Sequence, residues 1–135
     1  MPQLIEHIDA IARKKQRDVL IVEFHNKTTG FRMDYRVNPA RKIILDWFTA
    51  NGIPYCECGP YASETRMESY RGQIYIDVPY DKSDPVFQNV ASFLQNPDGS
   101  MSFEGAWFYK VSLDICMKNA HHDEPGFWDR WAGNF

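Results

Sequence analysis

The sequence of 135 residues predicts a single α+β domain, with residues 1–120 as its body and residues 121–135 as an aromatic C-terminal tail. Two observations predict this class. Apolar stripes of helical spacing alternate with short runs of strand-like alternation. The composition, 44% apolar and 24% charged, is ordinary for a globular protein, although 15% aromatic residues is high. We expect a two-layer sandwich with a mixed sheet of about five strands, in the order α-β-β-α-β-β-α-β, and helices mainly on one face. A ferredoxin-like arrangement is the alternative.

The first elements follow from residue spacing. A helical stripe opens the chain and is made of Leu4, Ile5, Ile8, Ile11 and Ala12. The β-branched run from Val19 to Phe24 and the alternation over residues 31–37 then predict a β-hairpin.

Asn38 and Pro39 are typical of a helix start, and Gly52 is typical of its end. Residues 53–58 predict a strand, with Pro54 at its start or at a sheet edge. Residues 59–72 have no clear period, and loops of this length in small domains are often functional.

Alternation predicts a strand over residues 73–78, and Ser83 or Asp84 is expected to cap the next helix. The last strand is predicted over residues 107–117, where odd-numbered residues from Trp107 to Met117 share one apolar face. This pattern puts Trp107 and Tyr109 in the core and Phe108 on the opposite face.

Four side chains are of metal-ligand type: Cys56, Cys58, His121 and His122. Their spacing differs from that of common zinc modules, so we expect no metal and no other cofactor. An odd count of three cysteines does not indicate a disulfide framework. The chain also has no apolar run long enough to cross a bilayer, so a cytoplasmic location without membrane association is expected.

Catalysis would require a nucleophile beside a base, and the candidates are His25, Cys58 and Asp77. No known catalytic spacing brings them together. A small enzyme or ligand-binding domain with a pocket near these three residues is therefore the alternative function.

A second alternative is a single-stranded nucleic-acid binder. Strand alternation places Arg32, Arg36, Tyr75, Phe108 and Lys110 on the second face of their strands, where bases could stack on them. The net charge of −3 argues against nucleic acid as the partner.

Aromatic side chains are concentrated in the tail and are also found in the long loop. Phe127, Trp128, Trp131 and Phe135 recur at helical spacing, with Asp123 and Pro125 where a helix would begin. Tyr61 and Tyr70 add interface-type residues from the loop. The tail must dock on its own domain or on a partner, because exposed rings of this kind form a sticky patch. The sequence thus favours a small accessory module of bacterial type that binds another protein or a second copy of itself and does not catalyse a reaction.

Overall fold

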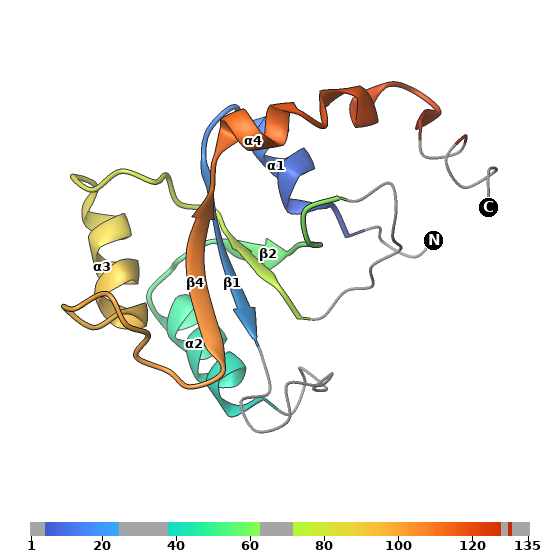
Figure 1. Cartoon of the computed structure of the whole chain (residues 1–135). Coiled ribbons are helices and arrows are strands. Elements are labelled where there is room, and N and C mark those ends of the chain that lie inside the picture. Colours follow the sequence, from blue (N-terminus) through green and yellow to red (C-terminus); the bar gives the residue numbers. More distant parts are fainter. Residues whose placement is uncertain (1–4, 25–37, 63–71, 128–129, 131–135) are drawn as a thin grey trace.

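The computed structural model describes residues 5–24, 38–62, 72–127 and 130. Its helices lie around one sheet (Figure 1). Within these ranges the elements are α1 (Ile8–Lys15), β1 (Val19–Phe24), α2 (Pro39–Ala50), β2 (Tyr55–Glu57), β3 (Ile74–Ile76), α3 (Pro85–Leu94), β4 (Ala106–Val111), α4 (Leu113–Met117) and the 3-10 helix η2 (Ala120–Asp123). The prediction of an α+β domain is confirmed. No helix in the described ranges is long and apolar enough to cross a membrane.

The four described strands form a sheet in the order β2-β3-β1-β4, and every neighbouring pair is antiparallel. β1 is central, with Ile21 opposite both Tyr75 of β3 and Tyr109 of β4. The sheet is therefore antiparallel over these strands, where we expected a mixed one. From β1 to β4 the elements run β-α-β-β-α-β, the element order of the ferredoxin-like motif given above as the alternative. The predicted hairpin partner of β1, residues 31–37, lies outside the described residues.

Helices cover both faces of the sheet, which corrects the prediction that they lie mainly on one. Leu20, Val22 and Phe24 of β1 face α2 and α3. Val19 and Ile21 face the opposite way, toward α1 and α4. Figure 1 shows α1 and α4 together at one end of the sheet, away from α2 and α3. Because helices cover both faces of β1, both sets of its alternating side chains are buried, and this explains why its sequence is continuously apolar.

The last strand ends at Val111, and residues Leu113–Met117 form α4 instead of continuing it. Ser112 caps this helix by accepting a hydrogen bond from the Ile115 amide. Asp18 Oδ1 accepts a second hydrogen bond, from the Leu113 amide, at 2.8 Å. Two side-chain acceptors thus satisfy helical amides that a strand would direct to a neighbour.

The two predicted capping sites are confirmed. The Asn38 side chain accepts from the Arg41 amide at the start of α2. Asp84, rather than Ser83, accepts from the Val86 and Phe87 amides at the start of α3. Gly52 has a φ of +67° after α2, a conformation that favours glycine.

Candidate functional site

The most exposed aromatic side chains of the described sheet lie on β4, where the sequence pattern predicted core. Trp107 is 61% exposed and Tyr109 39% exposed, whereas Phe108 between them is only 9% exposed. The prediction is wrong because the face of β4 that packs against α2 and α3 carries Ala106 and Phe108. On the other face, α1 and α4 pack on Val19 and Ile21, and the β1 residue opposite Trp107 is the carboxylate-bearing Glu23.

β4 is an edge of the sheet among the described strands, because only β1 is hydrogen-bonded to it. Edge strands are commonly protected by an outward lysine. Lys110 does not serve in this way, since its Nζ lies 3.5 Å from Asp18 Oδ2 and 4.5 Å from the Tyr80 ring centroid. We call the side of Ala106–Val111 that faces away from β1 the β4 edge.

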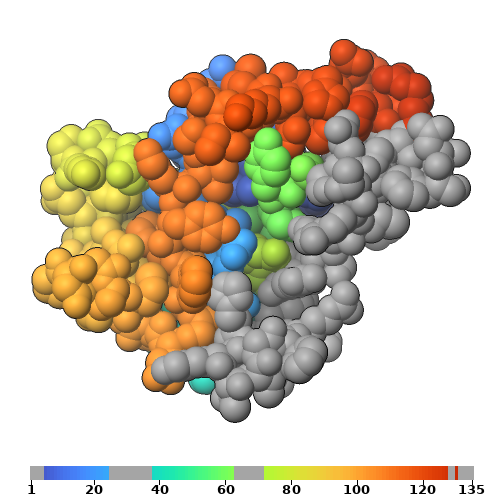
Figure 2. Space-filling model, viewed as in Figure 1, coloured from blue at the N-terminus to red at the C-terminus, as the bar shows by residue number. Residues whose placement is uncertain are grey.

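Two grooves flank the β4 edge, and the surface formed by β4 is visible in orange in Figure 2. The first groove has a volume of about 520 Å³ and is lined by Glu23, Gln95, Gly99, Met101, Trp107, Phe108 and Tyr109. The second has a volume of about 600 Å³ and lies between β4 and α3, with Leu20, Phe87 and Ala91 among its apolar lining residues. Gln95, Phe108 and Tyr109 line both, so the grooves adjoin along the strand.

A hydrogen bond fixes the orientation of the Tyr109 ring. Its hydroxyl donates to Glu23 Oε1 at 2.6 Å. Burial of the phenol, followed by this carboxylate, raises the pKa of Tyr109, so the hydroxyl remains a donor at neutral pH. The ring is therefore held in place beside Trp107.

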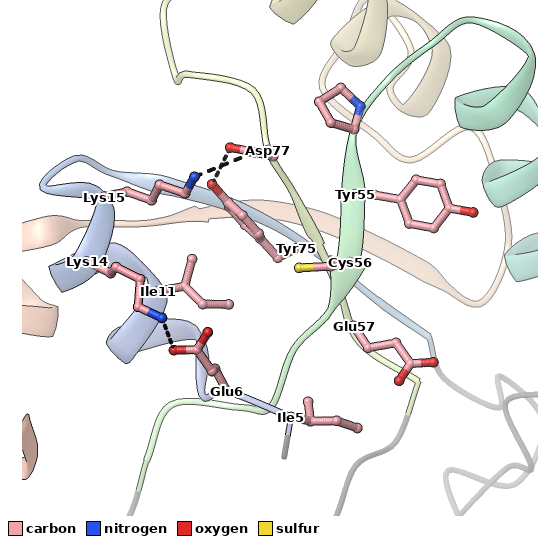
Figure 3. A pocket seen from close by; sticks show the side chains of 11 residues that line it. Ile5, Glu6, Ile11, Lys14, Lys15, Tyr55, Cys56, Glu57, Tyr75 and Asp77 are labelled. Carbon is pink, nitrogen blue, oxygen red and sulfur yellow. Dashed lines mark hydrogen bonds and ion pairs between the residues drawn. The ribbon is translucent and has the colours of Figure 1, made fainter. Parts of the chain in front are cut away.

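A separate pocket of about 660 Å³ lies between α1 and the β2–β3 edge, and Figure 3 shows its side chains. We call it the α1–β2 pocket. Its lining is mixed in charge, with Glu6, Glu57 and Asp77 against Lys14 and Lys15. Its walls also carry Cys56 and Tyr75.

Asp77, a candidate base, is engaged by three neighbouring side chains. Its Oδ1 accepts from Arg17 at 2.7 Å and from the Tyr75 hydroxyl at 2.8 Å, and Lys15 Nζ lies 3.6 Å from its Oδ2. Partial burial would raise the pKa of Asp77, but these donors and cations hold it below its usual value. A carboxylate stabilised in this way is a weak proton acceptor at neutral pH.

Cys58, the candidate nucleophile, is fully buried between the sheet and α1. Burial raises the pKa of its thiol far above the usual value, with smaller contributions from Cys56 and Glu23, and a thiol in this state is a poor nucleophile. It does not line the α1–β2 pocket, where Cys56 lies instead. His25 lies outside the described residues.

The four candidate metal ligands are not gathered into one site. Among the described residues no group of three or more His, Cys, Asp or Glu side chains could hold a metal ion. His121 and His122 contact each other and Phe127, with the His122 and Phe127 rings stacked at a centroid separation of 4.6 Å.

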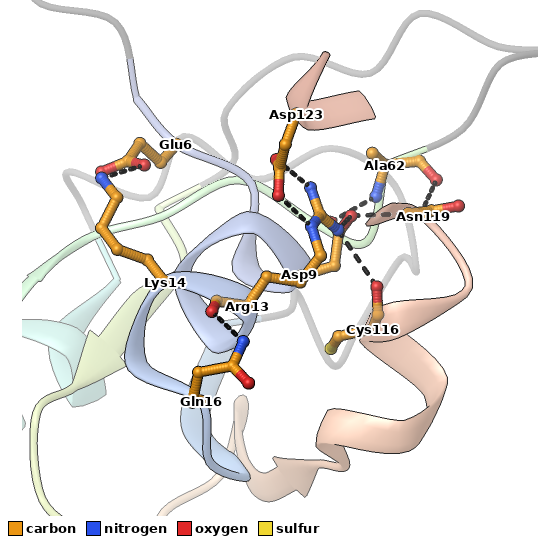
Figure 4. A network of polar contacts seen from close by, with 9 residues as sticks. All are labelled: Glu6, Asp9, Arg13, Lys14, Gln16, Ala62, Cys116, Asn119 and Asp123. Carbon is orange, nitrogen blue, oxygen red and sulfur yellow. Dashed lines mark hydrogen bonds and ion pairs between the residues drawn. The ribbon is translucent and has the colours of Figure 1, made fainter. Parts of the chain in front are cut away.

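A polar network attaches the C-terminal segment to α1 (Figure 4). Arg13, only 6% exposed, donates to both oxygens of Asp123 at 2.8 Å and to Asp9 at 2.9 Å. Its Nη1 also donates to the carbonyl of Cys116. Asp9 is fully buried and accepts further hydrogen bonds from the Ala62 amide and from Asn119. Both carboxylate oxygens of Asp123 thus accept hydrogen bonds from an arginine of α1.

Two of the predicted interaction residues are described. The Tyr61 hydroxyl donates to the Ile115 carbonyl at 3.1 Å, which joins the start of the long loop to α4. Phe127 is half-buried against His122. Tyr70, Trp128, Trp131 and Phe135 lie outside the described residues.

The predicted base-stacking platform is not formed by its described members. Tyr75 lies opposite Ile21 on the face that packs against α1, whereas Phe108 lies opposite Val22 on the other face. Their exposed fractions are 2% and 9%. Arg32 and Arg36 lie outside the described residues.

Sequence reasoning missed Trp107, Tyr109 and Arg13 as important side chains. The run Ala106–Tyr109 carries apolar side chains on both faces of the strand. The alternation of residues therefore could not show which of the two faces is buried. For Arg13 the only local sign was its i,i+4 spacing from Asp9, because its other carboxylate partner, Asp123, is 110 positions away.

No protein-family model, curated protein or solved structure matches the chain.

Proposed function

We propose that the chain is a non-catalytic protein–protein interaction module whose docking strand is β4. The observation that carries the proposal is the 61% exposure of Trp107 on an edge strand of the described sheet, beside the exposed and oriented Tyr109. Tryptophan and tyrosine are the side chains most enriched at the energetic centres of interfaces.

The geometry of the β4 edge supports a partner strand. The outer backbone of an edge strand offers amide and carbonyl groups to an added strand, and alternate side chains of that strand enter pockets on either face. The first groove lies beside Trp107 and Tyr109, and the second lies between β4 and α3. An extended segment of a partner with apolar side chains could pair with β4 and place those side chains in both grooves.

The catalytic alternative has less support. Asp77 is engaged by Arg17, Tyr75 and Lys15, and Cys58 is fully buried with a raised pKa. These contacts and this burial favour a structural role for Asp77 and Cys58 over proton transfer.

Selection from a library of random peptides tests the proposal. We expect enriched peptides to alternate apolar residues, as an added strand requires, and to bind the wild-type protein in fluorescence titrations. Trp107→Ser is expected to weaken their binding at least tenfold, because it removes the exposed anchor.

Ile43→Ser is the matched control, since Ile43 is 52% exposed on α2 and does not line either groove. It should leave binding unchanged. Equal binding by the wild-type protein and Trp107→Ser would contradict the proposal.

A further inference from the structure

We infer that the segment bound at the β4 edge is β4 of a second copy of this chain, paired antiparallel about a two-fold axis that passes between Phe108 and Phe108 of the second copy. The inference rests on the proposed function and specifies its partner. It is drawn from the order of side chains along β4 and from their exposure.

Strand geometry restricts how two copies of β4 can pair. Directly opposite residues of an antiparallel pair point to the same face of the sheet. In a two-fold pair, equivalent faces of the two copies also coincide. An odd-numbered residue must then lie opposite an odd-numbered one. One residue of β4 therefore lies opposite its own equivalent in the second copy, and the axis passes between these two residues.

Among these registers, the one centred on Phe108 places both exposed rings opposite rings. Trp107 then lies opposite Tyr109 of the second copy, and Tyr109 lies opposite Trp107 of the second copy. Centring on Trp107 would place Tyr109 opposite Gly105, and centring on Tyr109 would place Trp107 opposite Val111. Centring on Lys110 would place two lysines face to face, which is unfavourable.

The opposite face of the pair is also self-complementary in the Phe108 register. Ala106 lies opposite Lys110 of the second copy, so the smallest side chain of the strand meets the longest. The four rings meet on the other face, and aromatic pairs of this kind stabilise beyond the area that they bury.

Disulfide trapping tests both the partner and the register. Trp107→Cys and Tyr109→Cys are made separately in a Cys56→Ser background, because Cys56 is the exposed cysteine of the described residues. One of the two variants carries a mass tag. Each variant is oxidised mildly by itself, and a mixture of the two variants is oxidised in the same way. We expect a cross-linked heterodimer in the mixture and little cross-linking of either variant alone. In the Phe108 register, residue 107 and its own equivalent are diagonal neighbours about 7–8 Å apart, beyond the reach of most disulfides.

Sedimentation velocity of the unmodified chain supplies an independent measurement. We expect a concentration-dependent dimer whose dissociation constant rises at least tenfold in Trp107→Ser and is unchanged in Ile43→Ser. Cross-linking of either variant alone would overturn the register. A wild-type protein that stays monomeric and gives no cross-link would overturn the second copy as partner. Selected peptides that still bind through Trp107 would, in that case, leave the proposed function standing.

Discussion

Arg13 joins α1 to the segment that follows α4 through a buried polar network. It is buried together with the fully buried Asp9, and it donates hydrogen bonds to two carboxylates and one carbonyl. Buried charges are costly unless each is paired and hydrogen-bonded. The network meets this condition, since Asp9 also accepts from Ala62 and Asn119.

Removing one partner of the network should therefore be severe. We expect Arg13→Met to lower the free energy of unfolding by about 3–5 kcal/mol, because it leaves the buried Asp9 charge without its cation. Urea unfolding followed by circular dichroism measures the effect.

Lys42→Met is the matched control for Arg13→Met. Lys42 forms an ion pair with Asp46 at the same i,i+4 spacing, but both side chains are largely exposed. Its loss should cost about 0.5 kcal/mol or less. Similar costs for the two variants would show that burial is not what makes the Arg13 pair important.

At the scale of elements, the start of each long helix follows from nearby residues. Asp84 accepts two amide hydrogen bonds at the start of α3, while Ser83 bonds to Asp81 instead. We expect Asp84→Ala to lower the free energy of unfolding by about 1 kcal/mol, within the usual range for loss of a helix cap.

Ser83→Ala tests which residue caps α3, because the sequence alone was compatible with either Ser83 or Asp84. It should cost only a few tenths of a kcal/mol, as is usual for a surface position. Thermal unfolding of both variants beside the wild-type protein measures the difference. A larger loss from Ser83→Ala would contradict the assigned cap.

The sequence predicted these helices because a cap, a proline and an apolar stripe are local signals. It predicted the faces of β4 wrongly, since Ala106–Tyr109 is apolar on both faces and the burial of either depends on which helices cover it. The end of the strand at Val111 was also missed, because Asp18, one of the groups that hold α4, comes from a distant part of the chain.

At the scale of the whole molecule, several carboxylates couple stability to pH. Burial would raise the pKa of Asp9, but hydrogen bonds from Ala62, Arg13 and Asn119 hold it below its usual value. The hydrogen bonds from Arg13 do the same for Asp123. A carboxylate with a lowered pKa in the folded state stabilises that state above its ordinary pKa of about 4, and this contribution is lost as the pH falls further.

We therefore expect the contribution of these carboxylates to the free energy of unfolding to be complete at neutral pH and to fall as the pH drops through about 4. Asp9→Asn should be less stable than the wild-type protein at neutral pH but should show a shallower acid loss, because it lacks one of the titrating groups. Urea unfolding over a series of pH values measures both. An unchanged acid slope in Asp9→Asn would exclude Asp9 as a source of the pH dependence.

The arrangement of elements was predictable only in outline. The prediction of an α+β domain followed from local periodicity, whereas the pairing of β1 with β3 and β4 joins distant segments without a local signal. The candidate site was less predictable still. An edge position is a property of the assembled sheet, and the exposure of Trp107 depends on which face of β4 the helices cover.

The contact between Arg13 and Asp123 also has a consequence for synthesis of the protein. A ribosome makes residue 13 long before residue 123, so a nascent chain contains α1 without the second of its carboxylate partners. Until Asp123 emerges, Arg13 can pair with Asp9 of its own helix but not with its second carboxylate. Chains that stop short of residue 123 would carry an incompletely paired guanidinium, and we expect proteases to cleave them faster than the finished chain.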